Sequence, residues 1–278
     1  MGELFYWSLE RECFVASLTF MTVATNQYLE YWFDLYESSK SQNSNSEVHF
    51  QVFTDRKKDA EAYCVKHKTE NVSVIEIPNY RWPEATLLRY EIFSELGQYE
   101  QSGIYAHIDA DMIFSDLNEI RRRLELHDKE LLFVVHPGFF RPQGVRRVIY
   151  YFKNPLNVIK DLYKFLRDGG LGAWEVNKLS RAYVPYGNRH KYCCGGIWFG
   201  KRESFIQMCS QLSQEVKLDI AQGIIAKWHD ESFLNKYCVM FNDIDYLGPE
   251  FCFVEHYAQL RGLEPLIEAV EKGANKTR

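Results

Sequence analysis

The sequence predicts an α/β fold built around a central sheet. Short apolar runs that end in turn residues alternate along the chain with segments whose apolar residues recur at helical spacing. That alternation is typical of a largely parallel sheet with helices packed on its faces. At 278 residues, with 46% apolar and 15% aromatic residues, the chain can fill one sizeable core.

Six apolar runs bounded by turn residues are the expected strands. They lie at residues 17–25, 48–54, 72–77, 104–108, 132–136 and 197–199. Amphipathic segments between and after them predict six helices. These lie at residues 27–38, 57–66, 85–96, 117–126, 201–217 and 231–241. Residues 138–191 are irregular and rich in Tyr, Arg, Asn and Gly, so we expect a long functional loop there.

Charge and cysteine content exclude several classes of protein. The net charge is −5 and the 33 basic residues are scattered, so nucleic acid is not an expected partner. Seven cysteines with no C-x-x-C pair favour reduced, buried thiols over a disulfide framework. Cys193 and Cys194 should face opposite sides of a strand, which favours the core over a metal site.

The sequence contains no expected membrane span. No apolar run approaches the roughly 18 residues that a transmembrane helix needs. The N-terminal residues lack the basic start and apolar stretch of a signal peptide. The chain as given is therefore expected to be soluble, and the sequence predicts no oligomeric state.

A pair of aspartates follows the apolar run 104–108 directly. In an extended chain Asp109 and Asp111 would project from the same face, just beyond the carboxyl end of a strand, where open α/β sheets bind ligands. Two close carboxylates favour a bound cation, because they would otherwise repel each other. Mg²⁺ or Mn²⁺ held by one or two carboxylates and a substrate diphosphate fits this pattern.

Other nucleotide-binding signatures are absent from the sequence. It contains neither a G-x-G-x-x-G fingerprint nor a Walker-type phosphate loop. A dinucleotide-dependent dehydrogenase and a P-loop enzyme are therefore not supported, and transfer from a sugar nucleotide fits better.

A second acidic pair, Asp230 and Glu231, follows Trp228 at the start of an expected helix. A purely structural interpretation is available, because Asp230 is a good N-cap residue and Glu231 suits the helix dipole. A catalytic interpretation is equally open, because sugar transfer needs a carboxylate beside the anomeric carbon. The residues alone do not decide between the two.

The stretch "WHDESFLNKY" resembles a signature of the retaining α1,3-glycosyltransferases that include the ABO blood-group transferases and α1,3-galactosyltransferase. Further stretches resemble blocks of that family in its order: "VATNQYLEYWFDLYES", "HFQVFTD", "YRWPEATLLRYEIF", "HIDADMIF", "VVHPGFF", "YCCGGIWFG" and "LGPEFCF". The resemblance implies a GT-A-type fold in a single catalytic domain over residues 1–278. About 15–136 would form the UDP-binding half, and about 137–278 the acceptor-binding and catalytic half.

The resemblance also implies a reaction, in which a UDP-sugar, with Mn²⁺ as cofactor, donates to the 3-hydroxyl of a galactose-type acceptor glycan with retention. Glu231 would be the catalytic carboxylate and would also contact the acceptor, while Asp109 and Asp111 would hold Mn²⁺. The residues implied to bind the donor or UDP are Val23, Ala24, Thr25, Tyr28, Arg89, Asp109, Asp111, Cys194, Gly195, Gly196, Asp230, Lys272 and Arg278. Trp82, His136 and Trp228 fall where the family contacts the acceptor.

Three features of the resemblance concern specificity and the site's closure. Lys272 and Arg278 keep the spacing of two cations that close over the diphosphate in the family. Cys194 and Gly196 fall where the blood-group enzymes discriminate between donors, and Gly196 favours UDP-GalNAc over UDP-Gal because it leaves room for an acetamido group. Val254 stands where the family has an acidic acceptor residue, so the acceptor is not predicted.

Two alternatives accompany this interpretation. One is a catalytically inactive relative that binds UDP or a sugar, although retention of both acidic pairs favours the enzyme. The other concerns location, because animal members of the family carry an N-terminal anchor that this sequence does not show. A Golgi lumen location is expected if an anchor was removed, and a cytoplasmic one if the chain is naturally without it.

Overall fold

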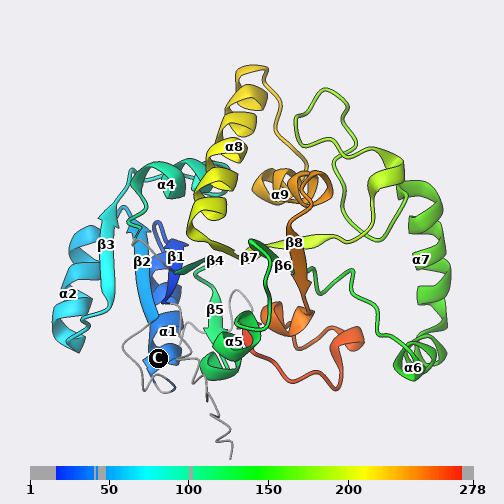
Figure 1. The fold of residues 1–278 in the computed structure, drawn as a ribbon, viewed down its shortest axis with the longest axis horizontal. Coiled ribbons are helices and arrows are strands. Elements are labelled where there is room, and N and C mark those ends of the chain that lie inside the picture. The colour runs from blue at the N-terminus through cyan, green and yellow to red at the C-terminus, as the bar shows by residue number, and fades with distance from the viewer. Residues whose placement is uncertain (1–16, 41, 43–47, 100–102, 271–278) are drawn as a thin grey trace, which may run out of the picture.

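The computed structural model describes residues 17–40, 42, 48–99 and 103–270 (Figure 1). Lys272 and Arg278, which the sequence placed over the diphosphate, lie outside these residues. Their expected role therefore stays a prediction.

A seven-stranded sheet runs through the centre of the described residues in the order β3-β2-β1-β4-β7-β6-β8 (Figure 1). Its strands are β1 (Leu18–Val23), β2 (Val48–Thr54), β3 (Val72–Glu76), β4 (Ile104–Ile108), β6 (Leu131–Val135), β7 (Cys193–Lys201) and β8 (Ile244–Leu247). The first four pair in parallel, whereas β7 runs antiparallel to both β4 and β6. The mixed sheet confirms the predicted α/β class and is consistent with a GT-A-type fold.

Both halves of the chain contribute to that one sheet. Strand β7, from the second half, inserts between β4 and β6 of the first. A small second sheet pairs β5 (Met112–Phe114) antiparallel with β9 (Ile267–Ala269). It therefore joins the segment just after β4 to the last described strand.

Helices cover both faces of the sheet, and each face has its own apolar cluster. On one face lie α1 (Tyr28–Lys40), α2 (Lys57–His67) and α5 (Leu117–Leu124), packed around side chains such as Trp32 and Phe50. On the other lie α3 (Glu84–Leu87), α4 (Arg89–Leu96), α8 (Arg202–Ala221) and α9 (His229–Met240), around Phe93, Trp198 and Phe205. The result is a three-layer arrangement with a separate core above and below the strands.

Strand periodicity decides which side chains reach which layer. Along β4, Ala106 and Ile108 join the first cluster, whereas Tyr105 joins the second. Cys193 and Cys194 at the start of β7 divide in the same way, so their expected burial on opposite faces is confirmed. Among the residues that the structure describes, every cysteine is a free thiol.

The prediction of a long loop over residues 138–191 was wrong in part. The region contains two helices, α6 (Val145–Lys153) and α7 (Pro155–Asp168), which stand at the outer edge of the molecule (Figure 1). Their apolar residues do recur at helical spacing. The many Tyr, Arg and Asn residues between them made the segment look irregular in the sequence. Asn154 and Pro155 separate the two, with the proline at the first helical position, where its missing N–H costs nothing.

Smaller departures concern element boundaries. The helix expected over residues 85–96 is divided at Leu88 into α3 and α4, and the strand expected at 197–199 extends over all of β7. Strands β5, β8 and β9 have only three or four residues, too few to show a pattern in sequence.

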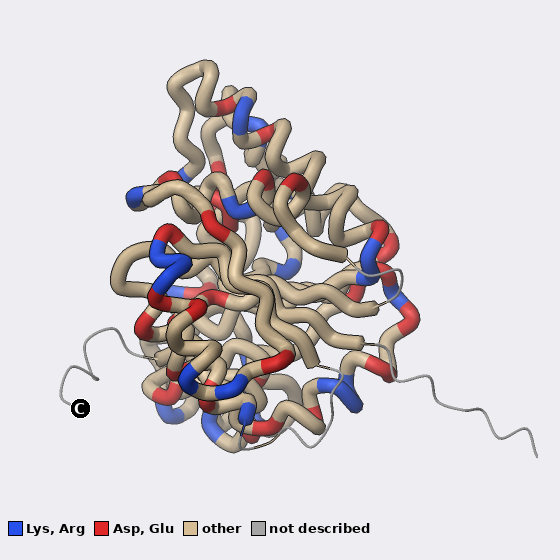
Figure 2. The backbone as a smooth tube through the Cα atoms, turned by 90° about the vertical axis from the view of Figure 1, so that its left-hand side faces the viewer, with Lys and Arg blue, Asp and Glu red and all other residues tan. Residues whose placement is uncertain are grey.

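Charged residues of both signs are interspersed on the side that Figure 2 shows. Within the described ranges, no helix is long and apolar enough to cross a bilayer.

Candidate functional site

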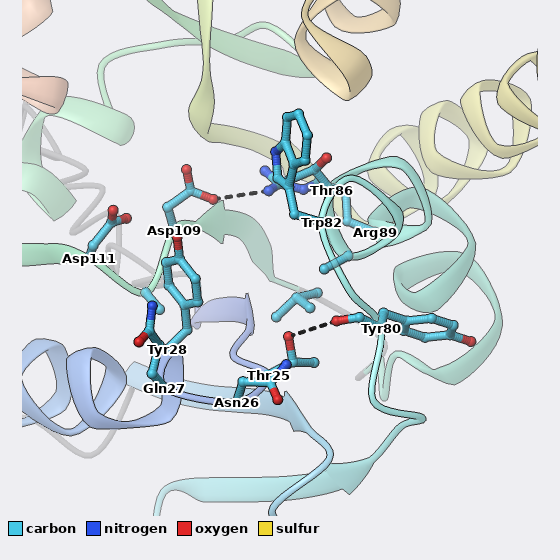
Figure 3. A pocket seen from close by; sticks show the side chains of 13 residues that line it. Thr25, Asn26, Gln27, Tyr28, Tyr80, Trp82, Thr86, Arg89, Asp109 and Asp111 are labelled. Atoms are coloured by element: carbon cyan, nitrogen blue, oxygen red, sulfur yellow. Dashed lines mark hydrogen bonds and ion pairs between the residues drawn. The ribbon is translucent and has the colours of Figure 1, made fainter. Parts of the chain in front are cut away.

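A cavity of about 370 Å³ opens where the parallel strands β1 and β4 end (Figure 3). The carboxyl ends of parallel strands are the usual ligand-binding edge of such a sheet. The residues that line it are Val23, Thr25, Asn26, Gln27, Tyr28, Tyr80, Trp82, Ala85, Thr86, Arg89, Asp109, Ala110 and Asp111.

Seven residues predicted as site residues meet in this cavity. They are Val23, Thr25, Tyr28, Trp82, Arg89, Asp109 and Asp111. Ala24, predicted with them, is fully buried and does not line the cavity; its N–H instead donates to the Phe53 carbonyl at 2.8 Å. The sequence missed Tyr80, whose carbonyl accepts a hydrogen bond from the Thr25 hydroxyl at 3.4 Å.

The aspartate pair lies in a turn rather than in an extended strand. Strand β4 ends at Ile108, and Ala110 and Asp111 form the turn that leads into β5. The Asp109 N–H donates to the Gly196 carbonyl at 2.8 Å, which ties this turn to β7. Both carboxylates still line one cavity, as predicted, although the turn rather than strand periodicity brings them together.

Arg89, the first residue of α4, joins the two acidic pairs. Its Nη2 lies 3.2 Å from Asp109 Oδ1, and its Nη1 lies 3.1 Å from Asp230 Oδ2. Nη1 also donates to the Gly195 carbonyl at 3.2 Å. The exposed fraction is 7% for the Arg89 side chain, 9% for that of Asp230 and 36% for that of Asp109, so the pair with Asp230 is the one shielded from water.

The surroundings of Arg89 keep it charged. Burial by itself would lower the pKa of the guanidinium, but the Asp230 and Asp109 carboxylates raise it above its ordinary range. Buried His107 has its pKa lowered to about 4, by burial first and then by Arg89. Its neutral ring therefore accepts from Arg89 Nη1 at 2.5 Å, with Nδ1 left to donate to the Met21 carbonyl at 3.3 Å.

The second acidic pair lies in the first turn of α9. The helix begins at His229, so Asp230 is not its N-cap as the sequence had predicted. Its N-cap is Trp228, whose N–H donates to the Ser232 hydroxyl at 3.0 Å. The serine four residues on thus satisfies one N–H at the start of the helix. The Asp230 carboxylate also interacts with the backbone N–H groups of the first turn, at Asp230 and Glu231.

Glu231 is held at both oxygens. The Tyr192 hydroxyl donates to Oε1 at 2.7 Å, and the Gly195 N–H donates to Oε2 at 2.8 Å. Burial raises the pKa of Glu231 to about 7, although these two hydrogen bonds oppose the shift. Burial likewise raises the pKa of Asp230 to about 6, against the opposing effect of Arg89.

Two positioning residues were missed in the sequence. Tyr192 starts the block in which Cys194, Gly195 and Gly196 were predicted to bind the donor. Asn235 lies one helical turn after Glu231, where it accepts from the Cys193 N–H at 2.7 Å and donates to the Cys193 and Glu231 carbonyls. The spacing of four residues was the available signal, since it places Asn235 on the same helix face as Glu231.

Little free volume surrounds Cys194, Gly195 and Gly196, of which the resemblance places the first and last where donors are discriminated. Cys194 packs into the first apolar cluster beneath the sheet and presents no side chain to the cavity. A Cβ on Gly196 would lie 2.9 Å from Asp109 Oδ2 and 2.7 Å from Met112 Cε, so the glycine lets these two side-chain ends approach the backbone of β7. The expected room for an acetamido group stays a prediction. At Gly195 a Cβ would meet Glu231 Cβ at 3.0 Å, so the glycine allows the carboxylate to approach.

The predicted acceptor residues surround the start of α9 on two sides. Trp82 is 74% exposed and contacts the His229 ring edge to face, with 4.8 Å between the ring centres. Trp228 is half-exposed. His136 packs against Tyr192, and burial lowers its pKa to about 4, so it is neutral.

The charges at the site fit a divalent cation that a substrate helps to hold. Arg89 offsets part of the negative charge of four carboxylates there, those of Asp109, Asp111, Asp230 and Glu231. In the described part of the chain no group of three or more His, Cys, Asp or Glu could hold a metal ion. Two carboxylates with diphosphate oxygens in the remaining positions are the arrangement that Mg²⁺ and Mn²⁺ accept.

Comparison with known proteins gives independent matches. Residues 163–278 match the model of glycosyltransferase family 6, a range that contains β7 and α9. Histo-blood group ABO system transferase 1 of Rattus norvegicus is 28% identical over 209 residues, which cover 73% of this chain and 51% of the rat protein. The chain is thus homologous to the ABO blood-group transferases at modest identity.

Two further relatives widen the comparison. The O-antigen biosynthesis glycosyltransferase WbnI of Escherichia coli is 27% identical over 233 residues, or 80% of this chain and 81% of WbnI. Globoside alpha-1,3-N-acetylgalactosaminyltransferase 1 of Mus musculus is 25% identical over 213 residues, or 74% of this chain and 52% of the mouse protein. The chain thus matches about half the length of the rat and mouse proteins.

Replacing Arg89 by alanine should destabilise the fold by about 3–5 kcal/mol at neutral pH, because a buried carboxylate loses its partner. The loss should grow as the pH rises. The folded state binds the Asp230 proton more tightly than the unfolded state, so the free energy of unfolding falls as the pH rises from 3.8 through about 6. Without Arg89 the pKa of Asp230 rises further, so this fall continues to higher pH. Urea unfolding across this range measures the effect.

A second substitution serves as the control. Asp230→Ala in the Arg89→Ala background removes the uncompensated carboxylate and should recover part of the stability. An equal loss at all pH values, with no recovery in the double variant, would contradict the proposed ion pair.

Proposed function

Since residues 163–278 carry a glycosyltransferase family 6 domain, we propose that this protein is a retaining glycosyltransferase. It transfers GalNAc or Gal from a UDP-sugar, in α1,3 linkage, to a galactose-type or GalNAc-type acceptor glycan. A divalent cation, Mn²⁺ in this proposal, supports the transfer. All of residues 1–278 form one catalytic domain in this view.

One observation carries the proposal. Arg89 draws the Asp109 carboxylate after β4 and the Asp230 carboxylate of α9 to one guanidinium. Its Nε is buried and makes no hydrogen bond within the described residues, which leaves one donor of a cavity-lining side chain unsatisfied. A nucleotide cavity, a pair of metal-binding carboxylates and a held glutamate thus occupy neighbouring positions.

The cavity accounts for the donor. Val23, Thr25 and Tyr28 bind the uridine, and Asp109 and Asp111 hold the cation against the diphosphate. When bound, the cation offsets the negative charge that develops on the UDP leaving group. Lys272 and Arg278 add positive charge there if the C-terminal tail closes over the site, as proposed from the resemblance.

Glu231 faces the anomeric carbon of the donor sugar in this proposal. Its ionised form stabilises positive charge on that carbon or attacks it, and either course leads to retention when the acceptor then enters from the original face. Tyr192 and the Gly195 N–H orient the carboxylate, while Asp230 and Arg89 bind the sugar hydroxyls. Trp82, His136 and Trp228 bind the acceptor, with an aromatic ring against the apolar face of galactose.

The donor choice falls on UDP-GalNAc by analogy with the mouse relative, whose name specifies an N-acetylgalactosaminyltransferase. The crowding of a Cβ at Gly196 by Asp109 and Met112 adds no support for that choice. The backbone of Gly195 and Gly196 would contact the donor instead.

A hydrolysis assay with UDP-GalNAc, UDP-Gal and UDP-Glc tests activity, donor and metal together. We expect release of UDP with UDP-GalNAc or UDP-Gal in the presence of Mn²⁺, and little release with EDTA. If UDP binds but no donor is hydrolysed or transferred, the protein is instead a catalytically inactive relative that binds UDP or a sugar.

Asp111→Asn should abolish Mn²⁺-dependent binding of UDP, because an amide oxygen lacks the charge that the cation requires. Isothermal titration with UDP, with and without Mn²⁺, measures this. Asp243→Asn, at an exposed surface position, is the matched control and should bind as the parent does. Unchanged affinity of the parent protein in EDTA would refute the metal site.

Glu231→Gln should leave UDP binding intact and lower transfer by several orders of magnitude, because the amide cannot stabilise the anomeric carbon. In the parent protein the rate should fall as the pH drops below about 7, where Glu231 becomes protonated. Glu203→Gln, on the exposed start of α8, is the control. Near-normal turnover in Glu231→Gln would remove Glu231 from the mechanism.

A further inference from the structure

The α6–α7 hairpin exposes its apolar side chains to solvent. Eleven large apolar side chains between Val145 and Leu166 are exposed, a concentration that no other segment of the described residues approaches. They are Val145, Val148, Ile149, Phe152, Leu156, Val158, Ile159, Leu162, Tyr163, Phe165 and Leu166. Monomeric soluble proteins rarely expose apolar residues in a contiguous group of this extent, which marks an interaction site.

The orientation of α7 is opposite to that of an ordinary surface helix. Its polar face turns toward the protein: Asp161 forms a two-bond ion pair with Arg141, at 2.5 and 2.6 Å. On the same face Asn157 donates to the Tyr150 hydroxyl at 2.7 Å, and Lys164 lies over the Phe139 ring. A surface helix usually does the reverse, so the outward apolar face requires an occupant.

Helix α6 repeats this arrangement. Its exposed apolar residues are Val145, Val148, Ile149 and Phe152, which share one face at helical spacing. Tyr150 and Tyr151 turn inward, where the Tyr151 hydroxyl donates to Asp161 at 2.9 Å. Both helices therefore contribute to one outward apolar surface, at the edge of the molecule that Figure 1 shows for α6 and α7.

The charge of this segment indicates what the surface contacts. Residues 141–168 contain seven basic and two acidic residues, for a net charge of +5 in a chain whose total is −5. Both acidic residues already pair with arginines, Asp161 with Arg141 and Asp168 with Arg167. Exposed Arg146, Lys153 and Lys160 flank the apolar surface.

We propose that the α6–α7 hairpin docks the protein on the surface of an anionic lipid bilayer. Amphipathic helices with basic residues beside exposed Phe, Leu and Ile lie in the interface, where the apolar side chains enter the acyl boundary and the cations meet the headgroups. A second copy of this chain fits less well, because a symmetric contact would bring two segments of net charge +5 together. This inference does not depend on the proposed function.

Sedimentation of the purified full chain with lipid vesicles tests the proposal. We expect binding to vesicles that contain phosphatidylglycerol, weaker binding to phosphatidylcholine alone, and release by salt. The variant Phe152→Ser, Ile159→Ser, Leu166→Ser should lower vesicle partitioning by at least about tenfold. These side chains are 86%, 67% and 66% exposed, so the substitutions should leave the unfolding midpoint unchanged.

Two further variants separate charge from general apolarity. Arg146→Gln, Lys153→Gln, Lys160→Gln should weaken binding to anionic vesicles by roughly fivefold for each residue, with little effect on neutral vesicles. Val65→Ser with Leu126→Ser, at exposed positions elsewhere, should bind as the parent does. Equal binding by all variants would overturn the proposal. The absence of vesicle binding would also overturn the proposal. If light scattering then shows self-association that the apolar variant abolishes, the surface binds a second copy of the chain instead.

Discussion

The buried guanidinium of Arg89 is the interaction on which the site depends. It lies between a carboxylate that ends β4 and one that begins α9, two segments separated by more than a hundred residues. Taking one arginine and two carboxylates out of water is costly, and their mutual attraction offsets that cost only while the geometry holds. The pairing therefore helps to fix the position of the cavity that Arg89 and Asp109 line relative to α9, which carries Glu231. His107, against the same guanidinium, is kept neutral because burial first, and then the charge of Arg89, lower its pKa.

Negative charge remains in excess at this site, and that excess prepares it for ligands. Burial raises the pKa of both Asp230 and Glu231, so their ionised forms are costly until positive charge arrives. Carboxylates whose pKa is perturbed by burial and by a charged partner are a common feature of catalytic sites, and Asp230 reaches the cavity-lining Arg89 through its ion pair. The hydrogen bonds from Tyr192 and Gly195 hold the Glu231 carboxylate in one orientation, so the fold sets both the direction of this group and its pKa.

Prediction from sequence succeeded for β1 to β4, and the roles of the two acidic pairs stay predictions, although the structure joins the pairs through Arg89. Elsewhere it failed in identifiable ways. Residues 138–191 were expected to be irregular because polar and aromatic residues hid the helical spacing of α6 and α7. Asp230 was expected to cap α9, yet the helix begins one residue earlier with Trp228 as its N-cap, and Ser232 accepts the Trp228 N–H. The donor preference expected from Gly196 stays a prediction, because the ends of the Asp109 and Met112 side chains lie beside this glycine, which no single sequence reveals.

The sequence by itself determined the local features: the buried strands, most helices and the two acidic pairs that bear the resemblance to a known family. Buried strands and amphipathic helices are encoded by neighbouring residues, so the periodicity of a short window is sufficient. Only the tertiary structure decided that Arg89 joins the two pairs, that Tyr192 and Asn235 position Glu231 and its helix, and that α7 turns its apolar face outward. Those outcomes depend on which distant segments pack together, and the spacing of residues within a short window does not determine such non-local contacts.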